Sequence, residues 1–203
     1  MFCYLKSQHI TYQNKTRLQM PEKDLYGGAF TAFLPEGARD VSDFRQIPDN
    51  QEVFTHAETD QSIIVEIMEY VEDTDDVAIK THFEDLAQGN EVSPHDSQIL
   101  HAEHIPADKV LCEHFDSVWY VIGQQNVAKF NENVKNTIDI HMGLIRLSEF
   151  SSDVLITFND PVNIHPMSSS HHAVPTNCTR WSVEDFKQML MSFNLHDTGI
   201  FGV

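Results

Sequence analysis

The sequence contains twelve histidines, which could take part in metal binding because imidazole nitrogens are common ligands of transition metals. His101 and His104 are separated by two residues in a segment with the composition of a strand, where they would face opposite sides. His171 and His172 are adjacent in a polar stretch, where histidines are usually solvated, and no HExxH motif occurs. The histidine pattern therefore predicts no metal site.

Two other groups could act as an acid, a base or a nucleophile. In the segment HFED, His82 and Asp85 are three residues apart and would meet on one face of a helix, where a local hydrogen bond or surface pair is the simpler interpretation. Cys112 stands beside Glu113 and His114 and could be an activated thiol, but no oxyanion-binding element accompanies it. P-loop and GxSxG motifs are missing from the sequence. These patterns predict a protein that is not an enzyme and holds no cofactor.

A run of acidic residues is the third group. Eight acids fall between positions 58 and 76 with no Lys or Arg among them: Glu58, Asp60, Glu66, Glu69, Glu72, Asp73, Asp75 and Asp76. Glu66 interrupts the apolar stretch SIIVEIME, and its carboxylate must reach water or a cation because unpaired burial is costly. Two interpretations stay open: the stretch has one solvent-facing side, or the acids form a docking patch for Lys and Arg of a partner.

The composition narrows the class of partner. The chain has 203 residues, enough for one domain, with 31 acids against 13 Lys and Arg and a formal net charge of −18. Such a surface repels nucleic acid and anionic lipid and attracts basic proteins. No apolar stretch reaches the roughly 18 residues needed to insert into a bilayer. Three widely spaced cysteines fit a reducing compartment, the cytoplasm or the nucleus.

The elements that must position these residues are mostly strands. We expect strands within residues 25–37, 52–55, 62–71, 98–105, 117–127, 139–147 and 153–159, and helices over 74–90 and 182–195. Short turns between the strands favour antiparallel pairing, and Ile200 and Phe201 should dock on the domain. We expect a single domain over residues 25–203, with residues 1–24 as a flexible extension and residues 161–178 as a mobile loop.

Six sequence blocks, taken in order, carry a family resemblance. They are LYGGAF (25–30), PEGARDVSDFRQIPDNQEVF (35–54), DQSIIVEIMEYVE (60–72), HFEDL (82–86), LIRLSEFSSDVLITFN (144–159) and LHDTGIFG (195–202). Together they span nearly the whole chain after Leu25, and the set resembles the Ran guanine nucleotide release factor family, or Mog family. Residues 1–24 extend beyond the family core.

The resemblance implies a fold and a function. The implied fold is α+β, an α/β/α sandwich in which helices flank a six-stranded, mostly antiparallel sheet, similar to the PsbP photosystem subunits. The implied function is to bind the small GTPase Ran and promote release of its guanine nucleotide, in transport between nucleus and cytoplasm. We expect a monomer. The alternative is a non-catalytic adaptor for other clients, such as the cytoplasmic region of a voltage-gated sodium channel, to which vertebrate members are linked.

The resemblance also assigns residues. The family's functional acids lie in an I-V-acid-x-x-acid motif, which places contact with Ran at Glu66 and Glu69. Asp49, Gln51 and Glu52 match the PDxQE block and are expected to line the same surface. On a regular strand Glu66 and Glu69 point to opposite faces, so joint contact predicts that the strand ends or bends near position 67.

Overall fold

A seven-stranded antiparallel sheet forms the centre of the computed structural model, which describes residues 20–128, 133–171 and 178–202. Its strands, in spatial order, are β3 (Arg39–Asp40), β4 (Gln51–Thr55), β5 (Ser62–Glu69), β9 (Ser152–Asn163), β8 (Lys135–Leu147), β7 (Ser117–Ala128) and β6 (Ser97–His104). The α+β sandwich is as expected. The sheet has seven strands instead of six because the two-residue β3 pairs with the end of β4.

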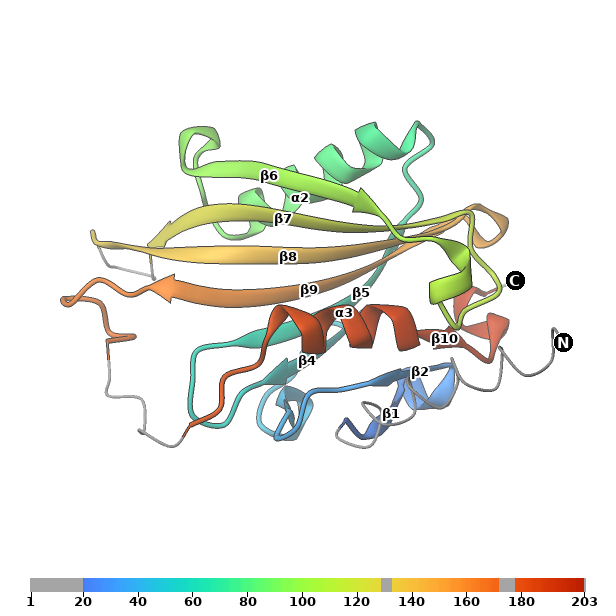
Figure 1. The fold of residues 1–203 in the computed structure, drawn as a ribbon, viewed down its shortest axis with the longest axis horizontal. Coiled ribbons are helices and arrows are strands. Elements are labelled where there is room, and N and C mark those ends of the chain that lie inside the picture. The colour runs from blue at the N-terminus through green and yellow to red at the C-terminus, as the bar shows by residue number, and fades with distance from the viewer. Residues whose placement is uncertain (1–19, 129–132, 172–177, 203) are drawn as a thin grey trace, which may run out of the picture.

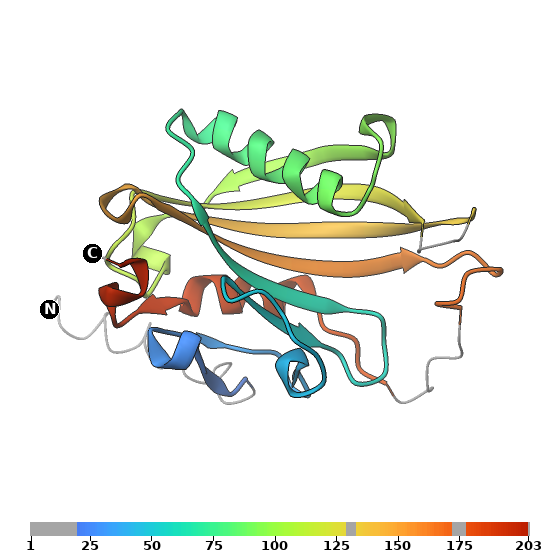
Figure 2. The ribbon, with the colours of Figure 1, turned by 180° about the vertical axis from the view of Figure 1, so that it is seen from behind.

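Two helices cover opposite faces of this sheet. Helix α3 (Val183–Ser192) lies in front of the sheet in Figure 1, and α2 (Asp75–Gly89) lies behind it, as Figure 2 shows. Glycines on two strands allow the close approach: a Cβ at Gly123 would lie 2.2 Å from the Phe83 ring of α2, and one at Gly143 would lie 2.6 Å from Leu190 of α3. The helices therefore pack directly on the backbone of the sheet.

The sequence signals at α3 are confirmed. Ser182 and Asp185 form a capping box, in which the Asp185 N–H donates to the Ser182 hydroxyl at 3.2 Å and the Ser182 N–H donates to the Asp185 carboxylate at 2.8 Å. The predicted apolar face of this helix is buried in the larger of two cores: Phe186, Met189, Leu190 and Phe193. A smaller core lies under α2 on the other face of the sheet.

A second, three-stranded sheet packs beside α3. It consists of β1 (Glu22–Leu25), β2 (Phe30–Phe33) and β10 (Asn194–Leu195). Strand β1 begins three residues before the expected start of the domain at Leu25, and residues 1–19 of the predicted extension lie outside the described residues. At the other end, Phe201 packs as expected, with its ring 4.8 Å from that of Phe150, whereas Ile200 is 37% exposed.

The segment that we predicted as a mobile loop over residues 161–178 begins as strand. β9 continues to Asn163, and Ser168 is buried, where its hydroxyl accepts a hydrogen bond from Asn136 at 3.0 Å. Residues 172–177 lie outside the described residues. Among the helices of the described part, none has the length and apolar character needed to cross a membrane.

Candidate functional site

The open end of the β4–β5 hairpin holds Glu66. Gln51 is its cross-strand neighbour, and the Gln51 side-chain amide donates a hydrogen bond to the Glu66 carboxylate at 2.6 Å. Glu66 is half-buried on the α2 side of the sheet, because it shares a face with Met68, which packs on the core under α2. Burial raises the pKa of the Glu66 carboxyl, and the Gln51 hydrogen bond and the nearby His82 only partly oppose this rise.

Glu69 lies on the opposite face of the same strand. Val65 and Ile67 on that face pack into the core beneath α3, and Glu69 follows them as an exposed residue. β5 keeps its register with β9 through Glu69, so the end or bend that we predicted near Ile67 does not occur. The prediction was wrong because the pairing of β5 with β9 continues beyond the point opposite Gln51, the first residue of β4, and keeps the strand regular.

The edge of β5 is free next to Glu69. The Ile67 N–H donates to the Asn50 carbonyl at 3.0 Å, and this is where β5 last contacts the chain leading into β4. The Tyr70 N–H donates to the Ser151 carbonyl at 3.1 Å, so the Glu69 peptide groups face the β4 side. In the described part of the chain no strand lies opposite them there.

The remaining predicted residues lie around the same end of the hairpin. Glu52 points to the α3 side, where it is half-buried and its carboxylate accepts a hydrogen bond from the Tyr26 N–H. Burial raises the pKa of the Glu52 carboxyl. Asp49 is exposed in the predicted turn, which is closed by the Gln51 N–H donating to the Pro48 carbonyl at 3.0 Å. The five residues are thus brought together, but on two faces of the sheet.

Tyr26 belongs to this end of the molecule and was missed from the sequence. Its hydroxyl lies 2.8 Å from the Asn50 carbonyl, in the turn before β4, and 2.9 Å from the Val65 carbonyl in β5, so its single proton is shared between the two carbonyls. Its φ angle of +51° is unusual for a bulky residue and is held by these contacts. The sequence signal for this turn was the pair Gly27–Gly28, which follows Tyr26 and forms a short 3-10 turn with it.

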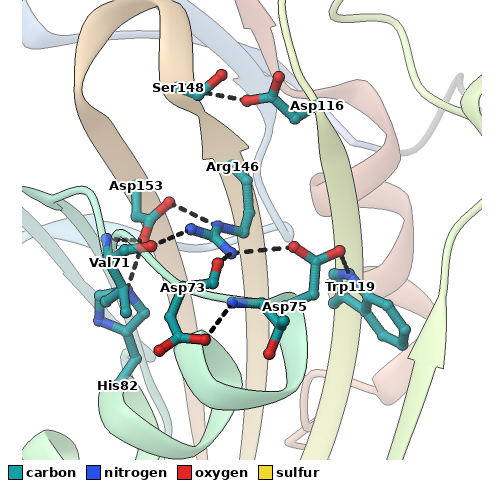
Figure 3. Close-up of polar contacts among 10 residues, drawn as sticks. Val71, Asp73, Asp75, His82, Asp116, Trp119, Arg146, Ser148 and Asp153 are labelled. Carbon is teal, nitrogen blue, oxygen red and sulfur yellow. Dashed lines mark hydrogen bonds and ion pairs between the residues drawn. The ribbon is translucent and has the colours of Figure 1, made fainter.

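Beneath this edge lies a buried ionic cluster centred on Arg146 (Figure 3). Arg146 on β8 is 1% exposed, and its Nε donates to Asp153 of β9, which is fully buried, at 3.2 Å. Its Nη1 donates to Asp75, the first residue of α2, at 3.0 Å. The Nε2 atom of His82 lies 2.8 Å from the second oxygen of Asp153. The partner of His82 is therefore Asp153, and not Asp85 as the spacing suggested; Asp85 is exposed.

The cluster also grips the segment between β5 and α2. Arg146 donates to the Asp73 carbonyl at 3.0 Å and to the Val71 carbonyl, and its guanidinium lies 4.2 Å from the centre of the Tyr70 ring. Asp153 accepts from the Val71 N–H at 3.1 Å. The sequence contains one signal for the cluster. Arg146 is a lone charge in the apolar run LIRL, and the next predicted strand, DVLITFN, begins with the acid Asp153.

The enzyme-like candidates gain no support from their surroundings. Cys112 is buried, and burial raises the pKa of its thiol, which lowers the fraction of reactive thiolate at neutral pH. His101 and His104 lie exposed on β6. Across residues 20–128, 133–171 and 178–202, no group of three or more His, Cys, Asp or Glu is placed to hold a metal ion.

Comparison with known proteins gives the chain its relatives. A family model described as "Ran-interacting Mog1 protein" matches residues 23–161. The Ran guanine nucleotide release factor of Danio rerio is 44% identical over 188 residues, which cover 89% of this chain and 99% of the relative. The Ran guanine nucleotide release factor of Homo sapiens is 41% identical over 190 residues, covering 90% and 98%.

Solved structures agree with this relationship. The crystal structure of the Saccharomyces cerevisiae Ran-binding protein Mog1p superposes with a TM-score of 0.64 at 24% identity, covering 90% of this chain and 99% of that one. A mutant of the protein Mog1 superposes with a TM-score of 0.66 at 26% identity, covering 90% and 98%. With the family model matched over most of the chain and relatives above 40% identity, this protein belongs to the Mog1 family.

Proposed function

We propose that this protein binds the small GTPase Ran and promotes release of its guanine nucleotide, as a regulatory partner and not as an enzyme. Membership of a family described as Ran-interacting supports the partner, and the names of the fish and human relatives support the release activity. One observation of this chain carries the proposal: Glu66 and Glu69 flank a free strand edge at the end of β5.

A partner that approaches this edge can reach both acids. β4 pairs with β5 only as far as Glu66. A partner surface that lies against the unpaired end of β5 would contact Glu66 on one face of the strand and Glu69 on the other. No bend in β5 is needed for joint contact. We expect basic side chains of Ran to pair with the two carboxylates, with Asp49, Gln51 and Glu52 lining the approach. The net charge of −18 favours encounter with such a surface.

Release of a tightly held nucleotide requires no covalent step. A binder that prefers nucleotide-free Ran weakens nucleotide binding by the same factor by which bound nucleotide weakens the binder's affinity. A coupling of about 4 kcal/mol gives roughly a thousandfold weakening, at about 1.4 kcal/mol per tenfold change. In this proposal the acids supply the affinity for Ran, and the preference for nucleotide-free Ran sets the coupling free energy.

The direct test is release of a fluorescent nucleotide from purified Ran, loaded in turn with GDP and GTP analogues. We expect accelerated release with this protein, near-complete loss of binding in Glu66→Lys, and unchanged activity in Asp108→Lys, a control at an exposed acid outside the site. Tight binding by a folded Glu66→Lys variant would refute the site. Binding of Ran without faster release would instead favour the adaptor function, for which a sodium channel cytoplasmic segment is one client to test.

The cellular setting follows from the same proposal. A protein that acts on Ran during nuclear transport should be found in both nucleus and cytoplasm, and a relative from Saccharomyces cerevisiae is named as a nuclear import protein at 29% identity. We expect a monomer in solution, since one copy carries all the residues of the proposed site. Analytical ultracentrifugation of the protein alone and with Ran measures both the monomer and the complex.

A further inference from the structure

We propose that Arg146 is a positioning residue for the Ran-binding acids, which extends the function proposed above and rests on it. Arg146 is nearly fully buried, so its side chain is not part of the surface that a partner would meet. What it does hold is the backbone of the segment that leaves the end of β5 and enters α2 (Figure 3). That segment begins directly after Glu69 and carries the exposed acids Glu72, Asp73 and Asp76.

The contacts of the cluster fall on alternate residues of the segment. The Val71 N–H donates to Asp153, and the Val71 carbonyl accepts from Arg146. Arg146 also donates to the backbone carbonyl of Asp73 and to the carboxylate of Asp75. The side chains at positions 72, 73, 74 and 76 are exposed. The buried guanidinium thus holds the backbone of an acidic segment whose side chains are largely exposed.

The cluster lies on the same side of the sheet as Glu66. His82 lies 2.8 Å from Asp153 and close enough to Glu66 to affect the pKa of that carboxyl. His82, Asp153 and Arg146 form one connected set of polar side chains beneath the edge of β5. The same set holds the backbone of the segment that follows Glu69.

Stability alone does not account for such a cluster. Removing the Asp153 carboxylate and the Arg146 guanidinium from water offsets most of their mutual attraction, and apolar side chains of similar volume often stabilise a fold equally well. Apolar side chains could not hold the two backbone carbonyls that Arg146 holds. The geometry therefore points to positioning of the acidic segment as the role of Arg146.

The test compares Arg146→Lys with Arg180→Lys. Lysine keeps the charge but loses the planar fork that reaches Asp153, Asp75 and two carbonyls at once. Arg180 is a matched control because it also pairs with a carboxylate, Asp160, and a backbone carbonyl, away from the site. We expect Arg146→Lys to remain folded, to exchange the amide hydrogens of residues 71–74 faster, and to bind Ran about tenfold more weakly, with Arg180→Lys unchanged in both measurements.

A second pair of variants covers the case in which Arg146→Lys does not fold. Asp75→Asn weakens one half-exposed arm of the cluster, and Asp76→Asn removes the same charge from the next residue, which is exposed and outside the cluster. We expect faster exchange over residues 71–74 and weaker binding of Ran in Asp75→Asn, with a smaller loss of binding and unchanged exchange in Asp76→Asn. Equal loss of affinity in the two variants would mean that charge, and not position, matters, and would overturn the inference.

Two further results would overturn it while leaving the proposed function intact. One is wild-type affinity in Arg146→Lys despite faster exchange; the other is unchanged exchange, which would mean that Arg146 does not hold the segment. Failure of the wild-type protein to bind Ran, or tight binding by Glu66→Lys, would instead refute the proposed function, and the inference with it.

Discussion

Glu66 and Glu69 should contribute unequally to Ran binding, although one motif contains both. Glu66 is half-buried and already oriented by the 2.6 Å hydrogen bond from Gln51, whereas Glu69 is exposed at the strand end. A charge that is desolvated in the complex typically costs about 2–5 kcal/mol when its pairing is lost. An exposed pair contributes only about 0.2–1 kcal/mol.

These magnitudes predict distinct affinities for two conservative variants. Glu66→Gln should weaken Ran binding by about 30-fold or more, and Glu69→Gln by about fivefold or less, at about 1.4 kcal/mol per tenfold change. The kinetics should also differ: loss of the half-buried charge raises the dissociation rate, whereas loss of the exposed charge lowers the association rate and its dependence on salt.

Stopped-flow association and surface-based dissociation at about 0.05 and 0.3 M salt measure both rates, since screening over this range acts mainly on exposed charges. Gln51→Ala serves as an intermediate case, because it leaves the Glu66 charge but removes its orienting hydrogen bond. The reasoning fails if Glu69→Gln costs as much as Glu66→Gln. It also fails if both variants change only the association rate.

Three further predictions concern stability. Burial raises the pKa of Glu66, so ionisation of this carboxyl opposes folding as the pH rises above the range of an ordinary glutamate. Glu66→Gln should therefore raise the melting temperature more at pH 7 than at pH 4. A smaller gain at pH 7 would contradict the burial effect. Gly123→Ala should lower the free energy of unfolding in urea by about 1–3 kcal/mol or more, since the added Cβ would lie 2.2 Å from the Phe83 ring; an unchanged midpoint would mean that α2 shifts freely. Phe201→Ala should lower the melting temperature by removing the stacked contact with Phe150, with a loss of about 2 kcal/mol for a partly buried ring, and proteolysis of the C-terminal residues should become faster.

Most of the fold that could be predicted from the sequence depends on short-range patterns. The capping box at Ser182, the turn at Pro48 and the apolar run of β5 each depend on neighbours a few residues away, and each was predicted within about two residues of its final place. The family motif likewise led to Glu66 and Glu69, because a motif is a local string. Pairing over short connections also made the antiparallel hairpins predictable.

The arrangement around the site depended on contacts between distant parts of the chain. Tyr26 bonds to the Val65 carbonyl 39 positions away, and Arg146 holds Val71 75 positions away, so neither leaves a periodic signal in the sequence. Strand alternation predicted that Glu66 and Glu69 face opposite sides, but only the tertiary structure showed that β4 starts opposite Glu66 and leaves the edge of β5 unpaired at Glu69. The sequence by itself determined which residues are acidic and which segments are strands. The tertiary structure decided which of those acids lie at the same end of the sheet, because hydrogen-bond partners are chosen by packing and not by spacing along the chain.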